Sequence, residues 1–247
     1  RSMVIIMDTK IIKIDRSNFD IEDLKEASEI LQAGGLVAFP TETVYGIGAD
    51  GLNEEASNKI FCAKGRPSDN PLIIHIADFD ALKVITKTIP EKGLKLAKQF
   101  WPGPLTLIFD KSKAVPYSIT GGLETIAIRM PSHPIAYELI RTSGVYVAAP
   151  SANTSGRPSP TKVEHVIDDL AGKIDYIIDG GKVDIGLEST IVDVTSPTPI
   201  ILRPGYITKA MIEEVIGPVN VDKAITSKSY NLNIIAKAPG MKYKHYA

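Results

Sequence analysis

The fold can be traced outward from residues 36–48, which read Leu36-Val37-Ala38-Phe39-Pro40-Thr41-Glu42-Thr43-Val44-Tyr45-Gly46-Ile47-Gly48. The first four residues are apolar and predict a short buried strand. This strand ends at Pro40, because proline lacks the N–H that the next ladder bond needs. We interpret the following residues as a loop in which the hydroxyls of Thr41 and Thr43 and the ring of Tyr45 face a cavity. Its two glycines would let backbone approach a ligand closely, although an ordinary turn explains this loop alone at least as well.

Helical and strand patterns alternate on both sides of this stretch. A strand is predicted at Lys10–Ile14, and a helix at Phe19–Ala33 that Gly34-Gly35 ends. Further strands are predicted at Leu72–Ala77, Leu105–Phe109, Thr125–Met130, Tyr146–Ala149, Tyr176–Ile178, Thr190–Val194 and Ile200–Leu202. Further helices are predicted from Asn53 to Lys64, at Glu91–Phe100, after Ser132, at Thr161–Leu170 and at Thr208–Ile216. The alternation indicates an α/β or α+β protein with helices packed on a sheet.

The composition is typical of a globular protein, with 247 residues of which 44% are hydrophobic and 23% charged. No stretch reaches the roughly 18–20 apolar residues of a membrane span, and nothing resembles a signal peptide. Cys62 is the only cysteine, which excludes an intramolecular disulfide and a cysteine-based zinc site. We therefore expect a cytoplasmic protein without membrane contact. The net charge of −1 argues for an anionic small molecule rather than a broad nucleic-acid surface.

A second polar loop, at residues 64–71, reads Lys64-Gly65-Arg66-Pro67-Ser68-Asp69-Asn70-Pro71. The compact charge of Lys64 and the planar fork of Arg66 together suit a polyphosphate, although a solvated surface loop is an equally good interpretation. Asn70 is held extended by the proline after it and can reach a base or a sugar. His75 follows within an apolar strand, where either a core histidine or a ligand contact is possible.

A third loop, residues 148–161, is rich in hydroxyl and amide side chains, among them Ser151 and Asn153. Ser159 can cap the predicted helix that follows it, with Pro160 at the favoured first position. The N-terminus of a helix binds phosphate through free N–H groups and the helix dipole. The loop therefore predicts a phosphate contact, with a rigid Ser/Thr turn as the alternative.

Two arginines and a glutamate complete the candidate residues. Arg129 and Arg203 each end an apolar strand, where a guanidinium can bind a carboxylate or phosphate, or form a structural salt bridge. Glu188 precedes another strand and either binds a metal or caps a turn. There is no nucleophile elbow, histidine cluster or dinucleotide fingerprint. Cations and hydroxyls without a nucleophile suit positioning and charge stabilisation in a phosphoryl or nucleotidyl transfer.

These segments, taken in order, resemble the YrdC/Sua5 family of threonylcarbamoyl-AMP synthases over about residues 10–216. The family has a twisted mixed β-sheet with surrounding helices and a concave basic cavity, which we expect here. The motifs that carry the resemblance are Pro40-Thr41-Glu42-Thr43-Val44-Tyr45-Gly46, Lys64-Gly65-Arg66-Pro67, Trp101-Pro102-Gly103-Pro104-Leu105-Thr106, Arg129-Met130-Pro131, Pro150-Ser151-Ala152-Asn153-Thr154-Ser155-Gly156, Glu188-Ser189-Thr190 and Leu202-Arg203-Pro204-Gly205.

The resemblance also implies which residues bind each substrate, with Lys64 and Arg66 as the catalytic pair. L-Threonine would contact Thr43, His75, Arg129, Ala149 and Ser189. ATP would contact Lys64, Arg66, Asn70, Thr125, Ser151, Asn153, Ser159, Arg203 and Tyr246. The protein itself is expected to supply no metal ligands, and Mg²⁺ would sit on the phosphates of ATP.

The implied activity is that of a nucleotidyltransferase. The threonine amine captures bicarbonate as a carbamate, which attacks the α-phosphate of ATP and expels pyrophosphate. This is the first step of N6-threonylcarbamoyladenosine synthesis at position 37 of tRNA. The product would pass to the tRNA threonylcarbamoyl transferase machinery, with weak or no direct tRNA binding. The rivals are an RNA-binding module and the carbamoyl transfer of hydrogenase maturation proteins.

Residues 8–217 are expected to form the YrdC-like catalytic domain, and residues 218–247 a linker or arm. The tail from Pro239 to Ala247 is similar to the linker that joins the two domains of Sua5-type members. We expect the smaller C-terminal domain of those members to be absent from this chain.

Overall fold

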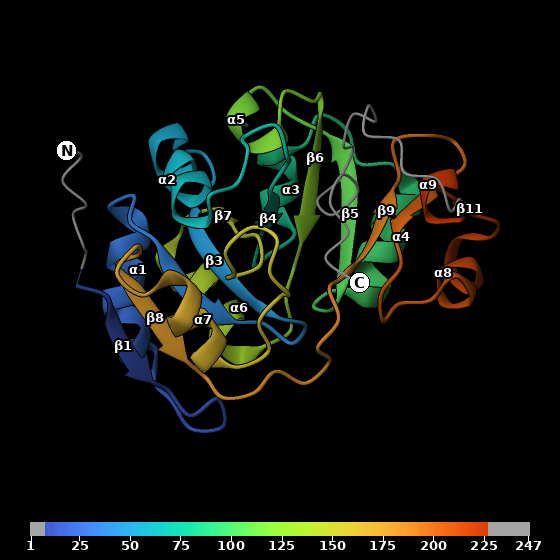
Figure 1. Cartoon of the computed structure of the whole chain (residues 1–247). Helices are drawn as coiled ribbons and strands as arrows, with labels where there is room; N and C mark the ends of the chain where they lie inside the picture. The colour runs from blue at the N-terminus through green and yellow to red at the C-terminus, as the bar shows by residue number, and fades with distance from the viewer. Residues whose placement is uncertain (1–7, 227–247) are drawn as a thin grey trace.

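The computed structural model describes residues 8–226, in which a single mixed sheet is covered by helices on both faces (Figure 1). Its strand order is β1-β8-β2-β3-β7-β4-β6-β5-β9-β10-β11. The strands are β1 (Lys10–Lys13), β2 (Val37–Pro40), β3 (Tyr45–Asp50), β4 (Ile73–His75), β5 (Leu105–Asp110), β6 (Thr125–Arg129), β7 (Val147–Ala148), β8 (Tyr176–Asp179), β9 (Thr190–Asp193), β10 (Ile200–Arg203) and β11 (Asn220–Val221). Because β4 pairs with β6 in parallel and β5 with β6 antiparallel, the predicted mixed α/β class is confirmed.

The helices lie between the strands in the chain, as the alternating pattern predicted. They are η1 (Ile21–Leu24, a 3₁₀ turn), α1 (Lys25–Gln32), α2 (Glu54–Lys64), α3 (Asp80–Ile85), α4 (Glu91–Phe100), α5 (Tyr117–Thr120), α6 (Pro134–Ser143), α7 (Val163–Leu170), α8 (Lys209–Ile216) and α9 (Lys223–Thr226). α4 has the predicted bounds. The side chain of Asn53 caps α2 as expected, accepting a hydrogen bond of 3.1 Å from the Ala56 N–H.

Successive residues of β2 belong to the two hydrophobic layers of the core, because side chains alternate across a strand. Val37 and Phe39 pack with Leu31 of α1 in one cluster. Ala38 packs with Ile60 of α2 in the other. The sheet is therefore buried on both faces around β2. Strong burial on both faces explains why this segment is a continuous apolar run in the sequence.

The prediction of a loop from Pro40 to Gly48 is wrong in its second half, because the chain enters β3 at Tyr45. A tight turn, closed by a 2.6 Å hydrogen bond from the Thr41 hydroxyl to the Val44 carbonyl, returns the chain antiparallel to β2. Gly48 is needed for packing: a Cβ there would lie 2.7 Å from Val147 and 2.8 Å from Phe39. A glycine taken as a ligand-approach position is thus a close-packing position.

The predicted helix start at Ser159-Pro160 is also wrong, because α7 begins at Val163 after Lys162. The backbone before it is used in other pairings: the Tyr45 N–H donates to the Pro160 carbonyl at 2.9 Å, and the Val183 N–H donates to Thr161 at 3.1 Å. Residues 159–161 lie outside the helix, and the carbonyls of residues 160 and 161 are bound by neighbouring segments instead. Ser159 therefore does not cap this helix.

Short elements were missed where the sequence carries little periodicity, namely α3, α5, β11 and α9. β11 pairs in parallel with β10, and Val219 before it is buried, so pairing with the sheet continues past residue 217. The division into a domain and a linker stays a prediction.

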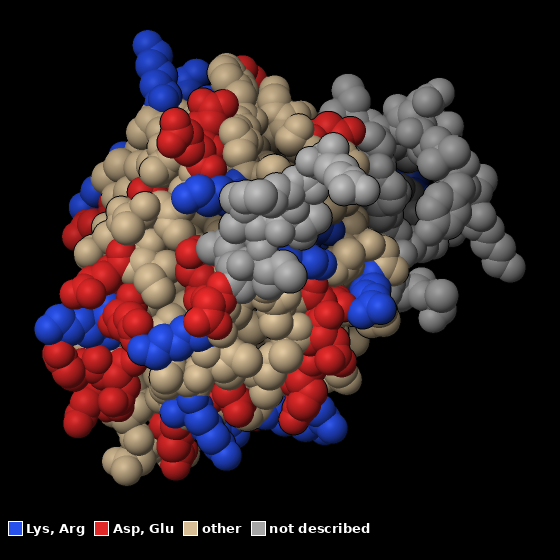
Figure 2. Space-filling view, turned by 60° about the vertical axis from the view of Figure 1, so that its left-hand side comes forward, with Lys and Arg blue, Asp and Glu red and all other residues tan. Residues whose placement is uncertain are grey.

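Acidic and basic side chains are mixed over the described part of the face shown in Figure 2, in keeping with the net charge of −1. Among residues 8–226, no helix combines the length and apolar character needed to cross a membrane.

Candidate functional site

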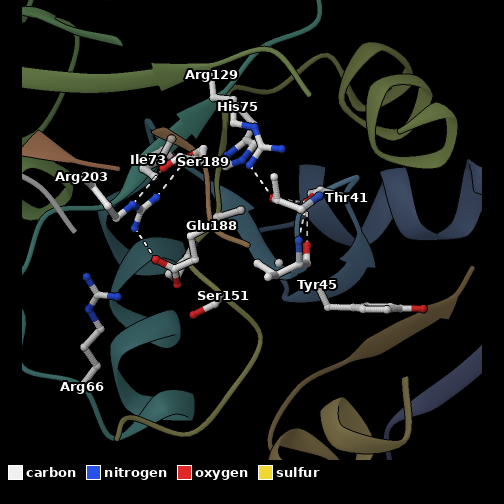
Figure 3. A pocket seen from close by; sticks show the side chains of 15 residues that line it. Thr41, Tyr45, Arg66, Ile73, His75, Arg129, Ser151, Glu188, Ser189 and Arg203 are labelled. Carbon is white, nitrogen blue, oxygen red and sulfur yellow. Dashed lines mark hydrogen bonds and ion pairs between the residues drawn. The ribbon is translucent and has the colours of Figure 1, made fainter. Parts of the chain in front are cut away.

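A cavity of about 520 Å³, including solvent at its mouth, lies where several strands and turns meet (Figure 3). Its walls come from segments far apart in the chain: the turn after β2, the ends of β4, β6 and β10, and the loop after β7. Ligands bind at such strand ends in α/β proteins. The lining residues are Thr41, Thr43, Val44, Tyr45, Gly46, Arg66, Ile73, His75, Arg129, Ala149, Pro150, Ser151, Glu188, Ser189 and Arg203.

Arg129 ends β6 and is held by two groups of the turn after β2. Its Nη1 donates to the Thr43 hydroxyl at 2.9 Å. Its Nη2 lies 2.7 Å from Glu42 Oε1 in an ion pair whose side chains are 5% and 7% exposed. Such a guanidinium at a cavity wall suits a carboxylate.

His75 ends β4 beside Arg129, its register partner on β6. Its Nδ1 lies 3.2 Å from the Ile73 carbonyl and therefore carries the proton in that contact. Burial, reinforced by the nearby Arg129 guanidinium, lowers the pKa of His75 to about 3. The imidazole is consequently neutral at physiological pH. Position alone left a core or a ligand role open, and His75 is both buried and part of the cavity wall.

Arg203, at the end of β10, is bound to the turn before β9. Its Nε donates to the Ser189 carbonyl at 3.0 Å and its Nη2 to the Ser189 hydroxyl at 3.0 Å, while Nη1 forms a buried ion pair with Glu188. Glu188 also accepts a 2.7 Å hydrogen bond from the Ser159 hydroxyl. The Ser189 hydroxyl shares a 2.7 Å contact with Thr106. Arg203 thus forms the structural salt bridge considered above while lining the cavity.

Lys64 connects the end of α2 to the loop after β7. Its Nζ donates to the carbonyl oxygens of Ser151 and Asn153, and the side chain is almost fully buried. Burial lowers the pKa of Lys64 to about 7, and the charge of Arg66 adds to this effect. A lysine that titrates near neutrality beside a cavity is typical of functional sites.

The loop that receives Lys64 is itself held by internal bonds. Asn153 donates through Nδ2 to the Thr154 carbonyl at 2.9 Å and to the Arg157 carbonyl at 2.8 Å. Asp169 of α7 accepts from the Thr154 N–H at 2.9 Å and pairs with Arg157. The loop is therefore fixed at both ends, which keeps Ser151 at the cavity wall.

Arg66 reaches the cavity from the other side of the same helix end. Gly65, with a φ of +59°, terminates α2 in the left-handed conformation. This turn directs Arg66 toward the cavity, where its Nη2 donates to the Pro71 carbonyl at 3.1 Å. Figure 3 shows Arg66 and Arg203 on the same side of the view, with Arg129 apart from them beside His75.

Eight of the fourteen predicted site residues line this cavity: Thr43, Arg66, His75, Arg129, Ala149, Ser151, Ser189 and Arg203. Lys64, Asn153 and Ser159 lie behind the wall and bond to it. Asn70 is buried, and Thr125 begins β6 opposite Asp110, but neither lines the cavity. Tyr246 lies outside the described residues.

Tyr45 and Glu42 differ from what the sequence predicts. The ring of Tyr45 does not point into the cavity: its hydroxyl donates to the Gly181 carbonyl at 2.7 Å, and the ring extends away from Arg129 in Figure 3. Glu42, which lies within the motif at residues 40–46, forms the buried ion pair with Arg129, and no local sequence signal predicts this partner.

Within residues 8–226, no group of three or more His, Cys, Asp or Glu side chains could hold a metal ion. The cavity and its wall therefore offer guanidinium groups, the ammonium of Lys64, hydroxyls, a neutral imidazole and the Glu188 carboxylate, which is paired with Arg203. The cations and hydroxyls among these groups bind and neutralise anions.

The fold and cavity define an α/β protein with a cavity lined by cationic and hydroxyl side chains at the strand ends of a mixed sheet. A protein-family model, Sua5_yciO_yrdC, described as "Telomere recombination", matches residues 29–205. The chain belongs to this Sua5/YciO/YrdC family.

Two curated relatives and one solved structure are close in sequence. The threonylcarbamoyl-AMP synthase of Pyrococcus abyssi is 56% identical over 224 residues, and that of Bacillus subtilis 55% identical over 225 residues. Both matches cover 91% of this chain, which spans only 65% and 64% of those relatives. The crystal structure of P. abyssi Sua5 complexed with L-threonine is 54% identical, with a TM-score of 0.92 over 97% of this chain and 69% of that one.

Proposed function

We propose that this chain catalyses the formation of threonylcarbamoyl-AMP and pyrophosphate from L-threonine, bicarbonate and ATP. One observation carries the proposal: a single cavity brings Arg66, Ser151 and Arg203 together with Arg129, His75 and Ser189. These are the groups expected for a nucleotide and for an amino acid. The names of the two synthases, and the threonine complex of P. abyssi Sua5, support the same reaction.

The amino-acid subsite is assigned to the wall around Arg129. The carboxylate of threonine binds this guanidinium, whose orientation is fixed by Thr43. Neutral His75 and the Ser189 hydroxyl offer uncharged polar contacts for the amine and the side-chain hydroxyl. Ala149 supplies an apolar wall for the methyl group.

The nucleotide subsite is assigned to the part of the cavity lined by Arg66, Ser151 and Arg203. Arg66 and Arg203 neutralise the phosphates, and Lys64 adds a charge when it is protonated. Ser151 supplies a hydroxyl at the wall, while Asn153 and Ser159 hold that wall in shape. Asn70, Thr125 and Tyr246 keep their predicted roles as further ATP contacts.

The reaction needs proximity and charge stabilisation, which these groups supply. Threonine ammonium and bicarbonate give the threonine carbamate, water and one proton. A carbamate oxygen then forms a bond to the α-phosphorus of ATP as the bond to the pyrophosphate oxygen breaks. Lys64 and Arg66 stabilise the charge that develops on the phosphates. Mg²⁺ would be bound by phosphate oxygens and water, which fits a site without a carboxylate cage.

The proposal also covers the fate of the product, the location of the protein in the cell and its contact with tRNA. The product would pass to the transferase that modifies adenosine 37 of tRNA, in the cytoplasm, without direct binding of tRNA by this chain. The net charge of −1 supports the last point, because binding to tRNA draws most of its affinity from a basic excess.

A substrate-omission assay tests the function. We expect pyrophosphate release from ATP only when threonine and bicarbonate are both present, with threonylcarbamoyl-AMP detected by mass spectrometry. Carbamoyl phosphate should not replace threonine and bicarbonate. Release that does not depend on threonine, or salt-sensitive RNA binding without turnover, would overturn the proposal.

A further inference from the structure

In the buried ion pair between Glu42 and Arg129, only the arginine lines the cavity. Arg129 and Thr43 line the cavity, whereas Glu42 does not. Glu42 therefore contacts the arginine from behind the cavity wall, 2.7 Å from Nη2, with both side chains almost fully buried. A substrate bound in the cavity would contact Arg129 without contacting Glu42.

Two anchors define the plane of the guanidinium. Nη1 is bound to the Thr43 hydroxyl and Nη2 to Glu42. Thr43 is in turn 3.0 Å from the hydroxyl of Thr41, which bonds to Val44. The Nε of Arg129 has no hydrogen-bond partner among the described residues. Because a guanidinium is a rigid planar fork, fixing two nitrogens also fixes the direction of the remaining N–H groups.

The backbone of Glu42 is also held in place. Its carbonyl accepts a 2.9 Å hydrogen bond from the Ile185 N–H, and the Thr43 carbonyl accepts one of 2.9 Å from Gly186. The segment that precedes Glu188 and Ser189 therefore docks on the turn that carries Glu42. This docking restricts movement of the Glu42 backbone.

The charge of Glu42 is maintained despite its burial. Burial by itself would raise the pKa of this carboxyl, but Arg129 and the backbone amides of Glu42 and Ser132 outweigh it and hold the pKa below its usual value. His133, which lies next to Ser132 in the chain, is neutral near pH 7 because burial and Arg16 lower its pKa to about 4. Of Glu42 and His133, only Glu42 therefore carries a charge that acts on Arg129 near pH 7.

We propose that Glu42 is a positioning residue, which orients Arg129 for the α-carboxylate of the amino-acid substrate without contacting that substrate. This inference rests on the proposed function, because it takes the Arg129 wall as the amino-acid subsite. On this proposal, a change in the Glu42 side chain alters the affinity for the amino acid and leaves the affinity for the nucleotide unchanged.

The test uses Glu42→Gln and Glu42→Asp. In Glu42→Gln the side chain loses its negative charge. Its NH2 group then faces N–H donors of Arg129 or of the backbone at Glu42 and Ser132, so that Arg129 reorients. In Glu42→Asp the charge stays, but the side chain is one methylene too short for the 2.7 Å contact. For both variants we expect KM for threonine to rise by about tenfold or more, since small misplacements of a binding group have effects of this size. KM for ATP should stay within about twofold.

The matched control is Glu138→Gln, which removes a carboxylate from an exposed pair with Arg141 outside the cavity. It should leave both KM values unchanged. An unchanged threonine KM in folded Glu42→Asp, or equal rises of both KM values in the Glu42 variants, would overturn the proposal. Circular dichroism and Tm establish folding, and Glu42→Asp keeps the buried negative charge if Glu42→Gln fails to fold.

A double-mutant cycle separates positioning from a general structural role. If Glu42 acts through Arg129, Glu42→Gln should have little further effect on threonine KM in an Arg129→Lys background. Full additivity would contradict the proposal. Calorimetric titration with threonine separates failure of the proposed function from failure of the positioning role. If the wild-type protein does not bind threonine, the proposed function is refuted. If the wild-type protein and the Glu42 variants bind threonine equally well, only the positioning role is refuted.

Discussion

The ammonium of Lys64 donates a 2.5 Å hydrogen bond to the carbonyl oxygen of Asn153, 89 residues further along the chain. A second bond goes to the carbonyl of Ser151. Both the neutral and the protonated amine can form these two bonds, but only the ammonium has a third N–H. The connection between α2 and the loop after β7 thus persists when Lys64 titrates, and protonation adds one donor and one charge.

The first prediction concerns the pH dependence of ATP binding. The pKa of Lys64 is about 7 in the free protein and should rise when phosphates bind nearby. ATP affinity should therefore be greatest below pH 7 and fall above it, by at most about tenfold per pH unit, until the pKa of the complex is reached. Calorimetric titrations from pH 6 to pH 9 measure this effect. Lys64→Met should remove it, and an unchanged pH profile in that variant would contradict the assignment.

Removal of either proposed catalytic cation, Lys64 or Arg66, should slow turnover. Arg66→Ala and Lys64→Ala each remove a charged donor from the developing phosphate charge, at a cost of roughly 2–4 kcal/mol in the barrier, or about 10²–10³-fold in rate. Pyrophosphate release measures the change. Arg141→Ala, at an exposed pair on α6, is the control and should retain full activity. Near-normal turnover in the two site variants, or loss of folding, would count against their role.

The protein should lose stability in acid through its buried histidines. Burial is the main reason that the pKa values of His133 and His75 are lowered, to about 4 and about 3. Each histidine is protonated in the unfolded chain below about pH 6.5 but stays neutral in the folded chain. Their stabilising contribution is complete above pH 6.5 and is lost as the pH falls toward 4, by at most about tenfold in the folding constant per unit and per histidine.

Urea unfolding at pH 7, 6 and 5 measures this loss. His133→Asn should reduce the dependence on pH, and the exposed control His165→Gln should leave it unchanged. Equal slopes in wild type and His133→Asn would show that His133 is not responsible.

Gly205→Ala should disturb both stability and the site. A Cβ at residue 205 would lie 2.6 Å from the Glu188 carbonyl oxygen and 2.6 Å from the Thr190 nitrogen, and backbone atoms of this kind cannot move aside alone. Overpacking of this kind costs typically about 1–3 kcal/mol. We expect a lower Tm and weaker ATP binding, because the displaced turn carries the partners of Arg203. A wild-type Tm would show that the turn adjusts without strain.

The elements and the candidate residues were largely predictable from the sequence. Burial on both faces produces continuous apolar runs such as that of β2, and helix ends carry local signals such as Asn53 and Gly65. β3 is not predicted from the sequence, because its glycines, Gly46 and Gly48, are typical of a loop. Only its neighbours Phe39 and Val147 explain why Gly48 must be small.

Ser159 shows the same limit. Its sequence context favours a helix cap, but pairing of residues 160 and 161 with distant segments prevents helix formation there. Local preferences of about 1 kcal/mol are readily overridden by such tertiary hydrogen bonds.

The amino-acid sequence by itself determined the class of fold, the order of its elements and the set of cationic and hydroxyl residues, because these depend on local pattern and residue chemistry. Tertiary structure alone decided which of those residues face one cavity. It also decided that Arg129 pairs with Glu42 and Arg203 with Glu188, and that Lys64 titrates near neutrality. Partner choice and pKa depend on distance and burial, which arise only when segments remote in the chain are packed together.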